Sequence, residues 1–198
     1  MGVSRLIGLD IGSSSVKMVE IDRAKKGYEL VFAGIAHLPD GTVADKEIKK
    51  ADAVTHSLKE LHKNSKSKTK RVSTSIAGRA VIIKMVTMTS MTDAQLEKQI
   101  QMEAEPYIPF DIKEVVLDYF IMGDRPEREG QMDVVLVAAR KAYVNEYLQL
   151  IKDVGFQPSV VDVDPFALEV MYETCYPTEQ EEVVGLVNVG ASTINVNI

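Results

Sequence analysis

The stretch that decides the fold is Leu-Ile-Gly-Leu-Asp-Ile-Gly-Ser-Ser-Ser-Val-Lys-Met-Val-Glu-Ile, residues 6–21. Residues 6–9 predict a short apolar strand, and residues 16–21 predict a second strand with nearly alternating side chains. The turn between these strands contains one glycine and three hydroxyl residues, Gly12, Ser13, Ser14 and Ser15. Small side chains let a ligand approach the backbone, and successive N–H groups in such a turn suit phosphate oxygens.

Two charged side chains flank this turn. Asp10 ends the first strand, where its carboxylate could hold the waters of a Mg²⁺ ion. Lys17 adds a positive charge that could bind the same phosphates. Taken alone, the stretch is better explained as an ordinary hairpin turn rich in glycine and serine.

A second stretch near the other end of the chain repeats the pattern. Residues 184–198 read Val-Gly-Leu-Val-Asn-Val-Gly-Ala-Ser-Thr-Ile-Asn-Val-Asn-Ile. The alignment that places Asn188 on Asp10 also places Gly190 on Gly12 and predicts an internal duplication. Two such turns facing one another would bind a polyphosphate from both sides. The second stretch therefore adds the following candidate nucleotide-binding residues: Asn188, Gly190, Ala191, Ser192 and Thr193.

This pair of motifs resembles the two phosphate motifs of the actin, heat-shock-70 and sugar-kinase superfamily, in which two similar domains close on a nucleotide. The resemblance implies an α/β fold, an actin-like ATPase domain of the ribonuclease-H-like type. It also implies one ATP–Mg²⁺ between the two domains of the intact protein, with Asp10 holding the metal through water.

Composition is ordinary for a globular protein, with 45% hydrophobic and 26% charged residues. The net charge of −6 gives no reason to expect nucleic acid as a partner. The single cysteine, Cys175, excludes an internal disulfide framework and fits a reducing compartment. With no secretory signal and no run of 18 apolar residues, we expect a cytoplasmic protein.

One low-complexity stretch, residues 63–71 (Lys-Asn-Ser-Lys-Ser-Lys-Thr-Lys-Arg), carries five cations. An anionic membrane surface could bind these cations. A solvated loop explains them equally well.

Hydrophobic spacing predicts a helix over residues 45–62, with Asp45 as its N-cap, and a strand over 72–77. The pattern then changes to an inserted β-α-β-β-α unit over residues 79–157. Expected boundaries are therefore 1–78 plus 158–182 for the first actin-like subdomain, 79–157 for the insert, and 183–198 for the first hairpin of a second domain. We expect the chain to be truncated before that second domain.

An insert that follows the first main helix and strand resembles the FtsA cell-division proteins and the related PilM family of type IV pilus assembly proteins. Four stretches resemble PilM more specifically: residues 102–110 (Met-Glu-Ala-Glu-Pro-Tyr-Ile-Pro-Phe), 114–119 (Glu-Val-Val-Leu-Asp-Tyr), 138–140 (Ala-Ala-Arg) and 163–168 (Val-Asp-Pro-Phe-Ala-Leu). The resemblance covers essentially the whole chain and implies the N-terminal part of such a protein.

The PilM resemblance implies an assembly role in pilus function and twitching motility. A PilM protein binds the cytoplasmic N-terminal tail of the membrane protein PilN and links it, with PilO, to the pilus motor ATPases. It lies in the cytoplasm and reaches the inner membrane through these partners. In the family the tail occupies the groove between the first domain and the insert. Met85, Met88 and Met91 are adaptable candidates for that groove, and core packing is the alternative for them.

Any nucleotide chemistry should be slow or absent. The resemblance gives Asp164 the position from which the superfamily polarises the attacking water, although a helix N-cap explains this residue equally well. Asn188 stands where related ATPases carry aspartate, and an amide lacks the charge that orients metal-bound water. Because only one of the two domains that would enclose the nucleotide is expected here, we expect poor ATP binding by these 198 residues.

Two other classes share the first hairpin. A sugar or acid kinase would bind a small substrate, for which the insert shows no recognisable residues. An FtsA-like filament protein would polymerise and would be tethered by an amphipathic membrane helix.

Overall fold

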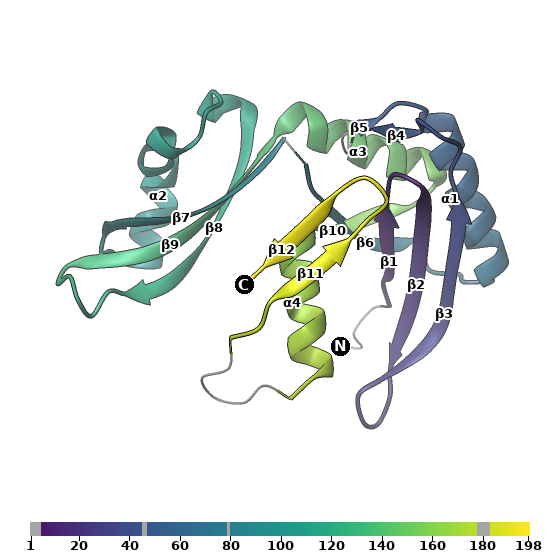
Figure 1. The fold of residues 1–198 in the computed structure, drawn as a ribbon, viewed down its shortest axis with the longest axis horizontal. Helices are drawn as coiled ribbons and strands as arrows, with labels where there is room; N and C mark the ends of the chain where they lie inside the picture. Colours follow the sequence, from purple (N-terminus) through teal and green to yellow (C-terminus); the bar gives the residue numbers. More distant parts are fainter. Residues whose placement is uncertain (1–4, 45–46, 79, 178–182) are drawn as a thin grey trace. The chain divides into compact units, whose positions relative to one another are not determined.

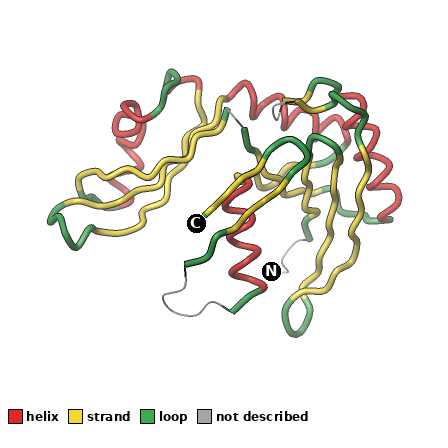
Figure 2. The backbone as a smooth tube through the Cα atoms, viewed as in Figure 1, coloured by secondary structure: helices red, strands yellow, loops and turns green. Residues whose placement is uncertain are grey.

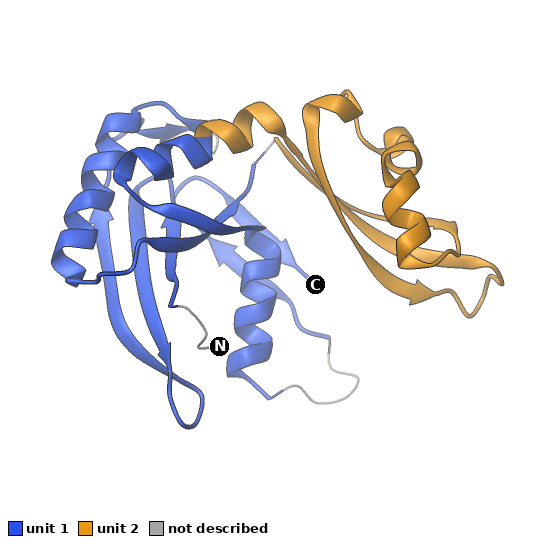
Figure 3. Ribbon diagram, turned by 180° about the vertical axis from the view of Figure 1, so that it is seen from behind, with its two compact units in different colours: residues 1–78, 147–198 blue, residues 79–146 orange. Residues whose placement is uncertain are grey.

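The computed structural model describes residues 5–44, 47–78, 80–177 and 183–198, which form two compact units (Figure 3). Unit 1 consists of residues 1–78 and 147–198, and unit 2 consists of residues 79–146. Unit 1 contains β1 (Ile7–Ile11), β2 (Ser15–Arg23), β3 (Tyr28–His37), β4 (Val43–Ala44), β5 (Glu47–Ile48), α1 (Ala51–Ser65), β6 (Arg71–Ile76), β10 (Gln157–Val163), α4 (Asp164–Cys175), β11 (Leu186–Val189) and β12 (Ile194–Asn197). Unit 2 contains β7 (Val81–Thr89), α2 (Asp93–Ala104), two short 3₁₀ turns (Glu105–Tyr107 and Ile112–Glu114), β8 (Val115–Asp124) and β9 (Gln131–Arg140). The division between the units falls within α3 (Lys141–Val154).

A five-stranded sheet forms the framework of unit 1, in the order β10-β6-β1-β2-β3 (Figures 1 and 2). The first three strands form an antiparallel meander, and β6 and β10 continue the sheet in parallel with β1. Side chains alternate along β1, where Ile7, Leu9 and Ile11 are buried and Gly8 and Asp10 are exposed. One face of the sheet therefore holds the core, and the opposite face carries the candidate site residues.

Helix α1 covers the core face of this sheet. Its buried residues, Val54, Leu58 and Leu61, follow helical spacing, and the helix contacts β2 and β3. The second half of α3 is also buried in unit 1, with Leu150 and Ile151 almost inaccessible to solvent. Both helices thus contribute to one hydrophobic core behind the sheet.

A buried hydroxyl pair fixes α3 to the sheet. The Thr74 hydroxyl donates to the Leu9 carbonyl oxygen at 3.1 Å and lies 3.1 Å from the Tyr147 hydroxyl. Because a threonine hydroxyl has a single proton, Tyr147 must be the donor in the second hydrogen bond. This contact explains why residues 147–157, which the sequence analysis assigned to the insert, have their contacts in unit 1.

Unit 2 is a three-stranded antiparallel sheet, in the order β7-β9-β8, with α2 packed on one face. The Thr92 N–H at the start of α2 donates to the Gln95 side chain at 2.9 Å, as in a capping box. The core of this unit consists of Val86, Met88, Leu96, Ile100, Ala104, Ile108, Val115, Met132, Val134, Leu136 and Ala138.

The three methionines of β7 and its following loop have different environments. Met88 is 7% exposed and belongs to the core of unit 2, and Met91 packs against that core. Met85 points to the other face of the sheet and is 63% exposed. Core packing is therefore the correct interpretation for Met88 and Met91, whereas Met85 is available to a partner.

The first helix starts later than its hydrophobic spacing predicts. Instead of a helix from residue 45, residues 43–44 pair with residues 47–48 as two short strands, and α1 begins at Ala51. The N–H groups of Lys49 and Lys50 both donate to the Thr42 carbonyl oxygen, which closes this loop before the helix. The proposed N-cap Asp45 lies outside the described residues. Among the helices that the structure describes, none is both long and apolar enough to cross a membrane.

Replacing Leu58 with alanine tests the core of unit 1. Leu58 is completely buried under the sheet, so Leu58→Ala should lower the free energy of unfolding by about 2–5 kcal/mol. Hydrogen-exchange protection of the β1 and β2 amides in increasing urea measures this change. His56→Ala, an exposed position on the same helix, is the control and should leave protection unchanged. Equal effects of the two variants would contradict this description of the core.

Candidate functional site

The two glycine turns have the same backbone geometry. The Gly12 N–H donates to the Ser15 carbonyl oxygen at 2.9 Å, and the Gly190 N–H donates to the Thr193 carbonyl oxygen at 2.9 Å. A Cβ atom on Gly12 would lie 3.1 Å from the Ser15 carbonyl oxygen, and a Cβ atom on Gly190 would lie 3.1 Å from the Thr193 carbonyl oxygen. Each turn therefore favours glycine at this position for the same steric reason.

The strands that flank the turns also pair in equivalent registers. In the first hairpin Asp10 lies opposite Lys17, and in the second Asn188 lies opposite Asn195. The Lys17 ammonium is 2.6 Å from the Asp10 carboxylate, and both side chains are about half exposed. The second hairpin thus carries two neutral amides where the first carries an ion pair.

The two turns meet although their strands belong to different sheets. β11 and β12 form a separate two-stranded sheet, whose turn lies beside the turn between β1 and β2 in Figure 1. The Ser192 hydroxyl donates to the Ser13 hydroxyl at 2.9 Å. The two turns are therefore in direct contact through their serine hydroxyls.

Several backbone N–H groups of these turns are available to a ligand. The N–H groups of Ser13, Ser14, Ala191 and Ser192 make no hydrogen bond within the described ranges of the chain. The first turn is held in place from its other side, because the Leu38 N–H donates to the Ser14 carbonyl oxygen at 2.9 Å. A fixed turn with free N–H donors provides the chemistry that phosphate oxygens need.

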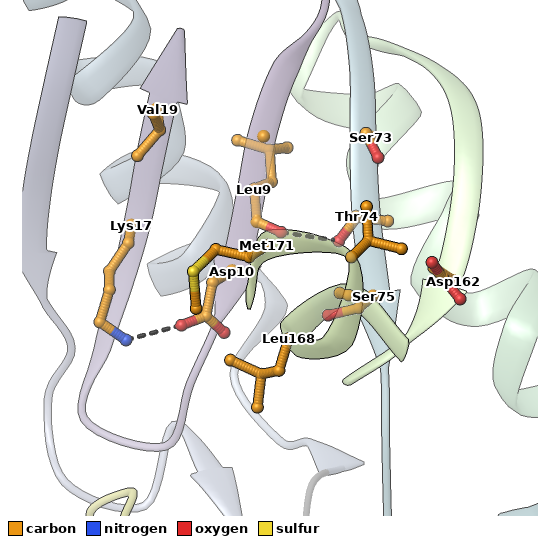
Figure 4. A pocket seen from close by; sticks show the side chains of 13 residues that line it. Leu9, Asp10, Lys17, Val19, Ser73, Thr74, Ser75, Asp162, Leu168 and Met171 are labelled. Atoms are coloured by element: carbon orange, nitrogen blue, oxygen red, sulfur yellow. Dashed lines mark hydrogen bonds and ion pairs between the residues drawn. The ribbon is translucent and has the colours of Figure 1, made fainter. Parts of the chain in front are cut away.

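A pocket of about 600 Å³ lies beside Asp10 and Lys17, between the open face of the sheet and α4 (Figure 4). Leu168 and Met171 of α4 form its apolar side, opposite the strands. The complete lining is Gly8, Leu9, Asp10, Lys17, Val19, Ser73, Thr74, Ser75, Asp162, Ala167, Leu168, Val170 and Met171. The pocket thus combines one charged end with a largely apolar wall.

Sequence reasoning missed four polar residues of this pocket, namely Ser73, Thr74, Ser75 and Asp162. They reach it because β6 pairs in parallel with β1, which places Ser73 opposite Gly8, and β10 pairs with β6, which places Asp162 opposite Ser75. Because side chains alternate along β6, residues 73 and 75 lie on the same face of the sheet. The pairing that brings this face to Asp10 is nonlocal and has no signal in the local sequence.

Asp164 is placed differently from Asp10 and Asp162, the two aspartates that line the pocket. It is the first residue of α4, and its carboxylate accepts a hydrogen bond from the Ser75 hydroxyl at 2.6 Å. The N-cap position belongs to Val163, one residue earlier than the sequence predicted. Asp162, rather than Asp164, lines the pocket. The catalytic role suggested for Asp164 stays a prediction.

The site fits phosphate better than it fits a metal held by protein ligands alone. In the described part of the chain, no group of three or more His, Cys, Asp or Glu residues is placed to hold a metal ion. Mg²⁺ commonly binds through one or two carboxylates, with waters and substrate phosphates completing its coordination. Asp10 has the position and the exposure for that arrangement.

Comparison with known proteins decides the family. Residues 8–198 match the family model described as type IV pilus assembly protein PilM. The chain belongs to the PilM family. The actin-like α/β fold that the resemblance implied is therefore confirmed, and PilM is favoured over the FtsA and kinase alternatives.

Two solved structures are similar to this chain. A chain of a structure titled "PilM-PilN type IV pilus biogenesis complex" is 27% identical, with a TM-score of 0.78 over 96% of this chain. The cytoplasmic domain of EpsL, an inner-membrane component of the type II secretion system of Vibrio cholerae, is 15% identical over 83% of this chain, with a TM-score of 0.52. The second likeness concerns the fold alone. This chain spans 60% of the length of the first structure and 59% of the second.

The geometry of the first hairpin predicts that alanine destabilises the protein at one of its glycines, Gly12, and not at another, Gly8. Gly12→Ala should lower the stability of unit 1 by about 1–2 kcal/mol, because the added Cβ presses on the Ser15 carbonyl oxygen. Gly8→Ala is the matched control, since its Cβ would meet the Val19 carbonyl oxygen at an ordinary 3.7 Å. Urea denaturation of both variants measures the difference. Equal stability would show that the first turn does not need glycine.

Proposed function

We propose that this chain acts as a PilM-type adaptor of type IV pilus assembly, which binds the cytoplasmic N-terminal tail of a PilN-type membrane protein. The observation that carries this proposal is the family match over residues 8–198, together with the 27% identity to a chain of a PilM–PilN complex. Binding to such a tail would hold the protein at the cytoplasmic side of the inner membrane. The further link to PilO and the motor ATPases is part of the same proposal.

The uncovered sheet face of unit 2 is the surface that we assign to the tail. Helix α2 covers one face of this sheet, and the side chains on the opposite face are exposed. Met85, Val135 and Phe120 lie in one row across β7, β9 and β8. Met85 is 63% exposed and Phe120 is 65% exposed. Such a row offers apolar contacts to alternate side chains of an extended peptide.

The strand order adds main-chain binding capacity. β7 and β8 are the outer strands of the three-stranded sheet of unit 2, and each has one edge without a strand partner in that sheet. An extended tail could pair with such an edge while its side chains lie on the apolar row. The tail is thus proposed to bind by main-chain hydrogen bonds and by apolar burial.

The proposed role of nucleotide is conformational rather than chemical. The backbones of residues 12–15 and 190–193 would hold the phosphates of ATP with the Lys17 ammonium, and Asp10 would hold Mg²⁺ through water. The metal supplies charge neutralisation for the phosphates when it is bound. Since the second turn carries Asn188 in place of a carboxylate, we propose slow or no hydrolysis. A bound nucleotide would then favour one arrangement of the parts of the protein.

Replacing Phe120 tests the proposed peptide surface. Phe120→Ser should weaken binding of a synthetic peptide with the N-terminal sequence of the cognate PilN-type protein by more than tenfold. Loss of a buried phenylalanine contact costs roughly 2 kcal/mol. Fluorescence anisotropy of the labelled peptide measures the affinity, and circular dichroism confirms the fold of each variant.

Met102→Ser is the control for this experiment. Met102 is 64% exposed in the same unit, but it lies on α2 and away from the uncovered sheet face. Its replacement should leave the peptide affinity unchanged. Wild-type affinity of Phe120→Ser would refute the proposed surface, and no binding by the wild-type chain would refute the PilN-type partner.

A further inference from the structure

Five exposed cations lie where α1 ends and the chain runs into β6. They are Lys63, Lys66, Lys68, Lys70 and Arg71, called here the basic strip. No acidic residue occurs within residues 63–71, although the whole chain has a net charge of −6. The strip thus concentrates positive charge on a protein that is otherwise acidic.

The backbone of the basic strip is held by hydrogen bonds rather than left as a loose loop. The Ser65 hydroxyl donates to the His62 carbonyl oxygen at 2.8 Å and accepts from the Ser67 N–H at 3.1 Å. The Ser67 hydroxyl accepts from the Thr69 N–H at 3.1 Å, and the Thr69 carbonyl oxygen lies 3.1 Å from His62 Nε2. These bonds hold the segment against the end of α1.

This bonding sets the direction of the cations. Ser65, Ser67 and Thr69 are half-buried, and the lysines that alternate with Ser67 and Thr69 are exposed. Lys66 ends α1 with a φ of 54°, and it is the only described non-glycine residue with a positive φ. The left-handed residue turns the chain from the helix into the extended strip, at a conformational cost that most side chains avoid.

The cations of the basic strip are not neutralised by neighbours. Across the described residues, none of the five forms an ion pair, and Arg71 donates only to the Ser159 hydroxyl, at 3.1 Å. Glu60 is exposed one helical turn before Lys63, without a salt bridge to it. Five charges therefore remain available to an anionic ligand.

We propose that the basic strip binds the anionic lipid headgroups of a membrane surface. The proposal rests on the proposed function, which places the chain beside the inner membrane. A planar surface can meet an edge of the molecule within the Debye length of about 8 Å, so the strip dominates over the acidic remainder. Single-stranded nucleic acid is less suited, because residues 63–71 contain no aromatic side chain on which a base could stack.

Lipid contact would act together with the protein partner. A lysine near an anionic membrane strengthens binding about fivefold, so the basic strip alone gives reversible attachment. Combined with a PilN-type tail, the second contact becomes intramolecular and raises the overall affinity without any new protein interface. The strip would also fix which edge of unit 1 faces the membrane.

Vesicle co-sedimentation of the 198-residue chain tests this proposal. The probes are phosphatidylcholine vesicles with and without phosphatidylglycerol. The test variant is Lys66→Asn/Lys68→Gln/Lys70→Gln, with asparagine at position 66 because it tolerates a left-handed backbone. The control is Lys25→Gln/Lys26→Gln/Lys98→Gln, three exposed lysines outside the strip that give the same net charge.

We expect binding to the phosphatidylglycerol vesicles that weakens with salt and falls on the order of 100-fold in the test variant. The control variant should bind like the wild type, and neither of these two proteins should bind vesicles of pure phosphatidylcholine. Equal losses in both variants would overturn the proposal, as would binding to pure phosphatidylcholine. Loss of vesicle binding in millimolar inorganic phosphate at constant ionic strength would assign the strip to a soluble phosphate instead. Tighter binding of single-stranded RNA than of vesicles would assign it to nucleic acid.

The PilN-type peptide separates this proposal from the adaptor function. The strip variant should bind the peptide with wild-type affinity, because the proposed peptide surface lies in unit 2. If the peptide fails to bind the wild type while vesicles bind through the strip, the adaptor function fails and the lipid contact stands.

Discussion

The structure depends on one steric and hydrogen-bonding constraint that occurs twice. In each hairpin a glycine N–H closes the turn onto the carbonyl oxygen three residues later, and a side chain on that glycine would press on the same oxygen. Both turns consequently keep their following N–H groups free, and the hydroxyls of Ser13 and Ser192 bring the turns together. The equivalence extends to the strand registers, so geometry supports the internal duplication that the sequence suggested.

The two copies of this unit have diverged in charge. Asp10 and Lys17 form an ion pair beside the first turn, whereas Asn188 and Asn195 leave the second turn neutral. A neutral second turn can still donate N–H groups to phosphate, but it cannot orient water on a metal. This difference in charge is the reason for proposing a conformational rather than a chemical role for nucleotide.

Local patterns predicted most of the fold, and nonlocal pairing explains what they missed. Alternation and turn residues were sufficient for the hairpins, because both act within a few residues. The predicted start of the first helix at residue 45 was wrong, because Ile48 fits the helical spacing while its backbone pairs with Val43. Ser75 and Asp162 join Asp10 only through parallel strand pairing, which no window of the sequence contains. The PilM resemblance supplied the family that local patterns could not.

Backbone amide NMR during a titration with magnesium pyrophosphate tests the central claim most directly, because this ligand carries the phosphates without a nucleoside. If the two turns form one phosphate site, the amide signals of Ser13, Ser14, Ala191 and Ser192 will shift together and report a single affinity. Shifts confined to one of the two turns would contradict the account. The absence of shifts in both turns, while other amides of the chain shift to saturation, would contradict it as well.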